Sequence, residues 1–327
     1  MIIQSDFRPL WWLSNAHLQT LWPVFFRRLQ NPPLRTERFE LPDGDFLDLA
    51  WAEGPGPLVL ILHGLEGSLA SHYAGLIGCL ANAGFQVVFL HFRGCSGEPN
   101  RLDRAYHSGE TGDLDQVVRH IRTRSGKTLY AAVGFSLGGN VLLKWLGEQG
   151  ASAPLETAVA VSVPYRLADG ARRLGHGMSR LYQAHLIRRL HASYRRKFSR
   201  RPSPLDVDLE MTRDFWSFDD QVTAPLHGFR DVHHYYAASS SRQFLKDIRV
   251  PALLIHALDD PFMFPDTVPE ESELSPSVVL ELSRRGGHVG FVGGRLLPEY
   301  WLEQRILRYL KSDPLRVSKT TPAQGGG

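Results

Sequence analysis

Short apolar runs alternate with amphipathic stretches along most of the chain. Residues 57–64 are PLVLILHG, and the runs FQVVFLHF, TLYAAVG, TAVAVSVP, PALLIHAL and SVVLELS follow at intervals. Such runs, rich in branched residues and bounded by Pro or Gly, are typical of buried strands. Apolar residues with helical spacing occur at about residues 71–83, at 113–124, where an acidic cap opens the helix, and in LGGNVLLKWLGEQ after Ser136. This repeated strand-then-helix order predicts an α/β fold, with a mainly parallel sheet and helices on both faces.

The same pattern suggests how the chain is organised. RFELPDGDFLDLAWAE predicts a hairpin around residues 42–44, whereas the alternation stops in an Arg-, His- and aromatic-rich, largely helical stretch. The expected segments are an N-terminal apolar arm (1–36), an α/β core (37–163 and 251–311), a helical cap insertion (164–250) and a disordered tail (312–327).

Composition and charge narrow the class of protein. With 327 residues and 43% hydrophobic content, the chain can bury a large core. Ten of its 37 Lys and Arg lie between Ala171 and Arg201, a stretch without acidic residues. Because a nucleic-acid binder more often spreads its charge over a whole domain, we do not expect a nucleic-acid partner. Two cysteines without CxxC spacing, no signal-peptide pattern and no apolar run near the ~20 residues of a membrane span predict a cytoplasmic protein.

Residues 134–138, GFSLG, match the pattern G-x-S-x-G where a predicted strand ends and a helix begins. This context is typical of a nucleophile elbow, in which glycines on both sides let the strand and the helix approach. The Leu137 N–H would then help to hold an oxyanion, with the Leu65 N–H in LHGLEGS as the second donor. The alternatives are a structural turn at Ser136 and an ordinary glycine turn at Leu65.

A base and an orienting acid follow the serine in the expected order. LLIHALDDPF places Asp259 and Asp260 directly after a predicted strand, and RRGGHVGF places His288 in a Gly-rich loop after the next one. We predict Ser136 as nucleophile, His288 as base and Asp260 as acid, because Asp260 lies beside Pro261 where the chain turns away. Asp259 is the alternative acid.

Other candidate chemistry is weaker. Polar residues gather at the expected carboxyl edge of the sheet, where open α/β folds bind ligands: His91, Arg93, His107, Glu110 and Asp113. Cys95 in the same loop fits a small buried residue better than a nucleophile. No HExxH, CxxC pair or strand-linked GxGxxG occurs, so neither a metal nor another cofactor is predicted.

Several blocks together resemble a known family: SNAHLQTLWP, HGLEGSLASHY, HFRGCSGEPNRLDRAYHSGETGDL, GFSLGGN, ALDDPF and GGHVGF. From about Phe7 to Leu310 the chain looks like the YheT-like branch of the α/β-hydrolases, related to animal membrane-anchored abhydrolase-domain lipases. The resemblance implies the α/β-hydrolase fold, a triad at the Ser136, Asp260 and His288 positions, and esterase or lipase-like activity. It does not supply a substrate.

The predicted reaction is acyl transfer from a small-molecule or lipid ester to water through an acyl-enzyme. An acyltransferase using the same residues, and a non-catalytic ligand-binding scaffold, are the alternatives. Oligomeric state is not predicted.

Two segments have open interpretations. The basic stretch 171–201 is either a solvated helical cap balanced by the acidic run DVDLEMTRDFWSFDD, or a surface that contacts an anionic membrane or selects an acidic ester. NAHLQTLWPVFF is either an arm packed on the core or a segment that touches a membrane.

Overall fold

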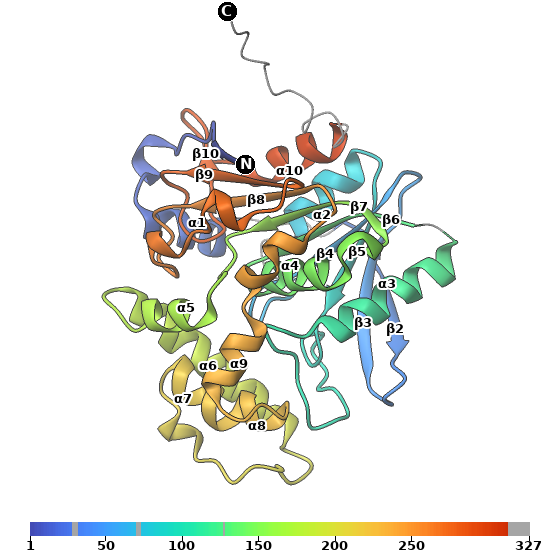
Figure 1. The fold of residues 1–327 in the computed structure, drawn as a ribbon, viewed down its shortest axis with the longest axis vertical. Coiled ribbons are helices and arrows are strands. Elements are labelled where there is room, and N and C mark those ends of the chain that lie inside the picture. The colour runs from blue at the N-terminus through green and yellow to red at the C-terminus, as the bar shows by residue number, and fades with distance from the viewer. Residues whose placement is uncertain (28–31, 70–72, 127, 313–327) are drawn as a thin grey trace, which may run out of the picture.

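A single sheet forms the centre of the computed structural model, which describes residues 1–27, 32–69, 73–126 and 128–312 (Figure 1). Within these residues the sheet has nine strands in the order β1-β9-β8-β7-β6-β4-β5-β3-β2. The strands are β1 (Ile2–Gln4), β2 (Arg35–Glu40), β3 (Phe46–Ala52), β4 (Leu58–Leu62), β5 (Gln86–His91), β6 (Leu129–Phe135), β7 (Leu155–Val161), β8 (Ala252–Ala257) and β9 (Val278–Ser283).

Most neighbouring strands are parallel, and β2–β3 and β3–β5 are the antiparallel pairs. The hairpin predicted around residues 42–44 is the β2–β3 pair, in which Arg35 lies opposite Trp51. The predicted α/β fold, with a mainly parallel sheet, is therefore confirmed.

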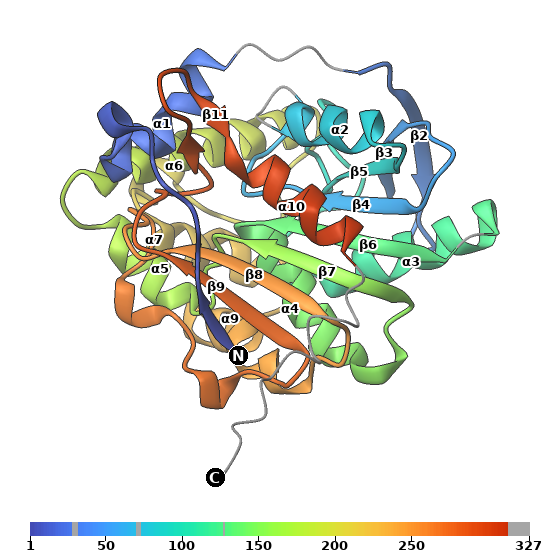
Figure 2. The ribbon, with the colours of Figure 1, turned by 90° about the horizontal axis from the view of Figure 1, so that it is seen from above.

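Helices cover both faces of the sheet because its strands are apolar on both sides. In β4, Leu58, Leu60 and Leu62 join one core, whereas Val59 and Ile61 join the other. The first core contains α3 (Thr111–Ser125) and α4 (Leu137–Gln149), and the second contains α2 (Tyr73–Asn82) and α10 (Trp301–Lys311) (Figure 2). The acidic cap predicted for α3 is Glu110, whose side chain accepts a hydrogen bond from the Asp113 N–H.

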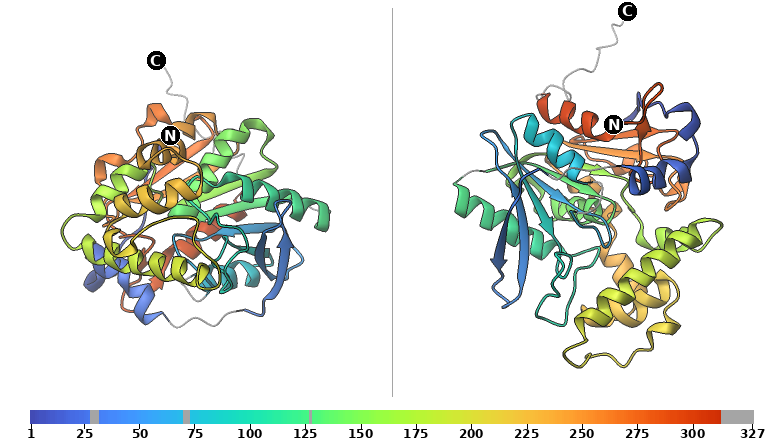
Figure 3. Two further views of the ribbon diagram at one scale, coloured as in Figure 1. Left: turned by 90° about the horizontal axis from the view of Figure 1, so that it is seen from below. Right: turned by 180° about the vertical axis from the view of Figure 1, so that it is seen from behind.

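Between β7 and β8 the chain leaves the sheet and forms a run of helices, which we call the cap (residues 164–250). Its helices are α5 (Leu167–Leu174), α6 (Ser179–Lys197), α7 (Phe215–Phe218), α8 (Ala224–Leu226) and α9 (Val232–Ser239). They lie together to one side of the sheet (Figure 3). Stretches of 3-10 helix occur at Trp11–Leu13, Gly150–Ser152, Leu209–Met211, Ser241–Asp247, Pro265–Thr267 and Glu271–Glu273.

The N-terminal segment is more ordered than an apolar arm suggests. β1 extends the sheet by pairing in parallel with β9. A strand of three residues is too short to be predicted from its sequence pattern. Helix α1 (Ala16–Phe26) contacts the small hairpin that β10 (Val292–Gly293) forms with β11 (Glu299–Tyr300). β1 and α1 thus contact the core, whereas Val24, Phe25 and Phe26 at the end of α1 are exposed.

Parts of three predicted segments lie outside the described residues, namely residues 28–31 of the arm, residues 71–72 at the start of the helix expected at 71–83, and residues 313–327 of the expected tail. In the described ranges, no helix has the length and apolar character needed to cross a membrane.

Candidate active site

Ser136 lies between β6 and α4, at the edge where the parallel strands end. Its backbone has φ 49° and ψ −117°, a conformation that residues other than glycine rarely adopt. Its N–H donates a hydrogen bond to the Val161 carbonyl of β7 at 2.8 Å. Strained backbone of this kind is concentrated at functional sites, and here it occurs at the turn predicted to be a nucleophile elbow.

Glycines on both sides of Ser136 are required by close main-chain packing. A Cβ on Gly138 would lie 2.4 Å from the His63 carbonyl oxygen, and one on Gly134 would lie 2.6 Å from the Gly138 carbonyl oxygen. Because the obstructing atoms are backbone, they cannot rotate away. The steric reason inferred from the sequence is confirmed.

We expect Gly138→Ala to lower the free energy of unfolding by about 1–3 kcal/mol, because the added methyl group forces the strand and the helix apart. Urea denaturation measures this. Gly78→Ala in α2 is the matched control, since a Cβ there meets open space. It should leave stability unchanged or raise it by roughly 0.5–1 kcal/mol. Equal stability of the two variants would contradict the packing argument.

The side chains of His288 and Asp260 lie beside Ser136 and come from loops after two other strands. His288 Nε2 is 3.0 Å from Ser136 Oγ, and His288 Nδ1 is 2.8 Å from Asp260 Oδ2. When Nδ1–H donates to the carboxylate, Nε2 is the nitrogen left to accept the serine proton. Phe262 stacks on the imidazole with ring centroids 4.0 Å apart and planes 2° apart. The ring is thus fixed by contacts at both nitrogens and on one face.

The two adjacent carboxylates have different contacts. Asp259 Oδ1 accepts a hydrogen bond from the Gly287 N–H at 3.0 Å, and burial raises the pKa of Asp259. Asp260 Oδ1 accepts one from the Phe262 N–H at 2.8 Å, while its other oxygen meets His288. Asp259 therefore holds the main chain of the histidine loop, and Asp260 contacts the imidazole itself.

The two N–H groups expected to bind an oxyanion belong to residues that line one pocket with Ser136. The Leu137 N–H is the first of α4, so it has no partner within the helix and lies at the positive end of the helix dipole. Leu65 follows β4, and its N–H donates no hydrogen bond within the described residues. Two such N–H groups beside a serine hydroxyl can bind the negative charge that develops on a substrate carbonyl oxygen.

Two side chains hold the loop that carries Leu65. His63 Nε2 accepts a hydrogen bond from the Phe92 N–H at 3.1 Å, and its Nδ1 lies 2.6 Å from the Gly64 carbonyl oxygen. Burial lowers the pKa of His63 to about 3, so the ring is neutral with its proton on Nδ1. Glu66 has φ 52°, and its carboxylate accepts hydrogen bonds from the Tyr106 and Ser193 hydroxyls. A core histidine and a bond to α6 thus fix this turn.

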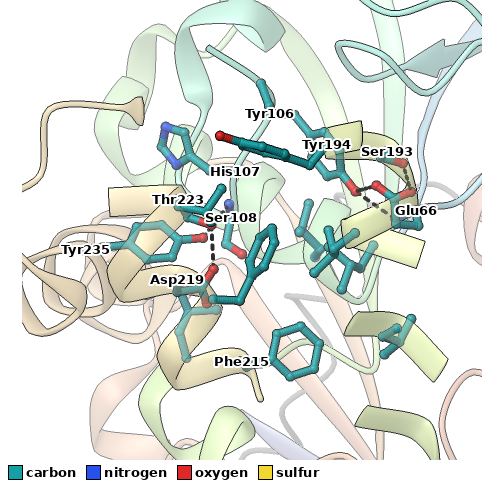
Figure 4. A pocket seen from close by; sticks show the side chains of 18 of the residues that line it. Glu66, Tyr106, His107, Ser108, Ser193, Tyr194, Phe215, Asp219, Thr223 and Tyr235 are labelled. Atoms are coloured by element: carbon teal, nitrogen blue, oxygen red, sulfur yellow. Dashed lines mark hydrogen bonds between the residues drawn. The ribbon is translucent and has the colours of Figure 1, made fainter. Parts of the chain in front are cut away.

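A pocket lies between the strand ends and the cap. Ser136 and His288 line it, together with Leu65 and Leu137. Its volume of about 190 Å³ far exceeds the ~10–15 Å³ that one water needs, so it has room for an organic group. Much of the cap side is apolar, with Leu167, Leu174, Leu186, Leu190, Phe215 and Val222. Polar side chains also line it, among them Glu66, Ser193, Asp219 and Tyr235 (Figure 4).

The polar residues expected at the sheet edge mostly hold loops. Among the described lining residues are Arg93 and His107, but not His91, Glu110 or Asp113. Arg93 is buried and donates hydrogen bonds to the carboxylates of Asp113 and Asp45. A guanidinium satisfied in this way supports the loop and is not available to a ligand. The pocket therefore lies at the predicted edge of the sheet, but most of the polar side chains predicted there do not face it.

Neither cysteine has the environment of a reactive thiol. Cys79 and Cys95 are free and half-buried, and burial raises the pKa of both. Because the thiolate is the nucleophilic form, Cys95 is a packing residue, as the sequence suggests.

The basic stretch of the cap uses most of its charges within the molecule. Within the described residues, Arg195 pairs with Glu210 of the acidic run that we expected to balance it. Other bases donate instead to main-chain carbonyls of core loops: Arg189 to Glu66, Arg196 to Gly94, Lys197 to Arg104 and Arg201 to Leu102. The acidic run is therefore a minor partner. Contact with an anionic membrane stays a prediction.

The sequence pattern did not identify the arm residues that support the histidine loop. Thr20 Oγ1 in α1 accepts a hydrogen bond from the His288 N–H at 2.9 Å. Gln19 is fully buried, and its side chain accepts from the Val292 N–H at 2.6 Å. A Gln and a Thr within the apolar block NAHLQTLWP were the available signal, since buried polar groups need partners.

Both the sequence and the fold of this chain are similar to those of known proteins. The family model described as alpha/beta hydrolase fold matches residues 57–294. The Escherichia coli (strain K12) protein named "Putative esterase YheT" is 44% identical over 94% of this chain and 93% of its own length. The Mus musculus protein "Phospholipase ABHD3" is 28% identical over 90% of this chain and 75% of its own. Among solved structures, the Pyrococcus furiosus esterase Pf2001 has a TM-score of 0.57 and 18% identity, over 87% of this chain and 97% of that one.

The structural neighbour shows the fold, and the family model and the sequence relatives show the family. The resemblance inferred from the sequence blocks is thereby confirmed, and the chain belongs to the α/β-hydrolase family, in its YheT-like branch.

Proposed function

We propose that this protein is a serine hydrolase that cleaves carboxylic esters through an acyl-enzyme on Ser136. One observation carries the proposal: the unbroken contact from Asp260 through His288 to the Ser136 hydroxyl, at the wall of an apolar pocket. A non-catalytic scaffold has no need of this chain of contacts. The esterase and phospholipase names of the relatives support an ester or lipid ester as substrate.

In the first half of the reaction, Ser136 Oγ attacks the ester carbonyl carbon while His288 Nε2 takes the serine proton. The carbonyl electron pair moves onto its oxygen, which the Leu65 and Leu137 N–H groups hold. The carbonyl then re-forms, the C–O bond to the alcohol breaks, and the alcohol leaves with the proton from His288. Asp260 keeps the imidazole in the required tautomer and stabilises its cation.

In the second half, water takes the place of the alcohol. The water oxygen attacks the acyl carbon while His288 accepts a proton from the water. The bond between the acyl carbon and Ser136 Oγ then breaks, His288 returns the proton to Ser136, and the acid leaves. An acyltransferase would differ only in the acceptor. The apolar cap wall, with Leu186 and Phe215, fits an acyl chain better than a charged group.

Hydrolysis of a p-nitrophenyl ester series of increasing acyl length tests the function, with and without an added alcohol as acceptor. We expect turnover of several esters, free acid as the main product, and inactivation by a fluorophosphonate probe. Predominant transfer to the alcohol would identify an acyltransferase. Failure to cleave any ester and to react with the probe would contradict a serine hydrolase.

A further inference from the structure

A carboxylate lies on the cap wall of the pocket, away from the proposed triad. Asp219 begins the π-helical turn Asp219–Thr223, an irregular helix form that is rare and frequently functional. Thr223 Oγ1 donates to Asp219 Oδ1 at 2.6 Å, and the Tyr236 hydroxyl donates to Oδ2 at 2.7 Å. Figure 4 shows Asp219, Thr223 and Tyr235 on one side of the pocket, with Glu66 and Ser193 on the other.

Among the described residues, this carboxylate has no cationic partner. In the part of the chain that the structure describes, no Lys, Arg or His forms an ion pair with Asp219. Its neighbours Phe218, Val222 and Ala224 are buried and apolar. Burial raises the pKa of Asp219 to about 6. A carboxylate in such surroundings is costly unless something pairs with it.

Asp219 also retains unused hydrogen-bonding capacity. An ionised carboxylate offers about four lone-pair positions, and the two hydroxyl donors occupy two of them. Because Asp219 lines the pocket, its remaining lone pairs can accept hydrogen bonds from a ligand in the pocket.

A series of hydrogen bonds links Asp219 to the helix that begins after the nucleophile. Asn140, one turn after Ser136 on α4, donates to the Ser108 carbonyl at 2.8 Å. The Ser108 N–H donates to the Tyr235 hydroxyl at 3.0 Å, and the next residue is the one that binds Asp219. Ser136, Ser108, Tyr235 and Asp219 all line the same pocket. A substrate acylating Ser136 can therefore meet Asp219 with another of its groups.

We propose that Asp219 binds a free hydroxyl group of the substrate, so that the enzyme prefers hydroxyl-bearing esters to purely alkyl esters. The inference rests on the proposed ester hydrolysis and specifies its substrate class. The opposing interpretation is that Asp219 only fastens α9 to the π-helical turn through Tyr236.

Matched ester pairs and two variants separate these interpretations. One pair is the propyl and the dihydroxypropyl ester of the same fatty acid, and the other is an alkanoate and its terminally hydroxylated counterpart. In the wild type we expect a higher kcat/KM for the hydroxylated member of at least one pair. Asp219→Asn should reduce that preference about tenfold or more, as expected for losing a hydrogen bond to a charged group.

Tyr236→Phe is the control, because it removes the hydrogen bond between α9 and the π-helical turn but keeps the carboxylate. It should retain the hydroxyl preference even if its melting temperature falls as much as that of Asp219→Asn. Absence of any preference in the wild type, or equal loss in both variants, would overturn the proposal. Cleavage of alkyl esters with no such preference would refute this inference alone and leave the hydrolase intact.

Binding provides a readout that does not need turnover. In Ser136→Ala, the hydroxylated ester should raise the melting temperature more than its alkyl partner, and adding Asp219→Asn should abolish the difference. No difference in Ser136→Ala would contradict a hydroxyl-binding role even if the protein hydrolysed no ester at all.

Discussion

Ser136→Ala is expected to lower kcat for ester hydrolysis by about 10⁴–10⁶-fold, the usual cost of removing a member of a catalytic triad. The variant lacks the oxygen that forms the acyl bond, whereas His288 and Asp260 keep their mutual contact. Fluorophosphonate labelling should disappear as well. Turnover of a p-nitrophenyl ester, probe labelling and the circular-dichroism melting curve measure these effects.

The fold of this variant should be intact, because only a hydroxyl is removed and the Ser136 N–H bond to Val161 is made by the backbone. Ser199→Ala is a suitable control, since Ser199 is exposed and its hydroxyl donates to the nearby Arg196 carbonyl. It should keep full activity and labelling. Wild-type turnover by a folded Ser136→Ala protein would rule out the proposed nucleophile.

Asp260→Asn should lower kcat by about 10⁴-fold, because an amide can donate to His288 Nδ1 and so favour the tautomer with its proton on Nε2. That tautomer cannot accept the serine proton. Asp259→Asn should cost far less, since its amide oxygen can still accept from the Gly287 N–H. Steady-state kinetics of the two variants side by side provide the measurement, and both melting temperatures show whether either loses its fold.

A larger loss in Asp259→Asn than in Asp260→Asn would contradict this assignment. Equal losses would do so too, because the structure gives the imidazole a contact with Asp260 and places Asp259 on the main chain of the histidine loop.

Local patterns were sufficient to predict the sheet and the turn at Ser136. Apolar runs such as 58–62 identify buried strands because both faces of this sheet are covered, so little polar alternation interrupts them. GFSLG at a strand end predicts the strained turn because close packing leaves no room for a Cβ at Gly134 or Gly138.

Long-range contacts were beyond the sequence pattern. The choice between two adjacent aspartates depends on which one reaches the imidazole, and pairing of β1 with β9 joins residues far apart in the chain. Charge counting also failed for the cap, because bases such as Arg189 bind carbonyl oxygens, which are present at every residue and leave no sequence signal. Asp219 belongs to the acidic run, and the composition of that run does not reveal that its carboxylate binds the Thr223 and Tyr236 hydroxyls at the pocket wall.

The most direct test of the account is rapid acid quenching of the wild-type protein during turnover of a p-nitrophenyl ester, followed by intact-mass and peptide mass spectrometry. We predict a covalent adduct with the mass of one acyl group, located on the peptide that contains Ser136, and its absence from Ser136→Ala. Turnover without any acyl adduct, or an adduct on another residue such as Cys95, would contradict catalysis through Ser136.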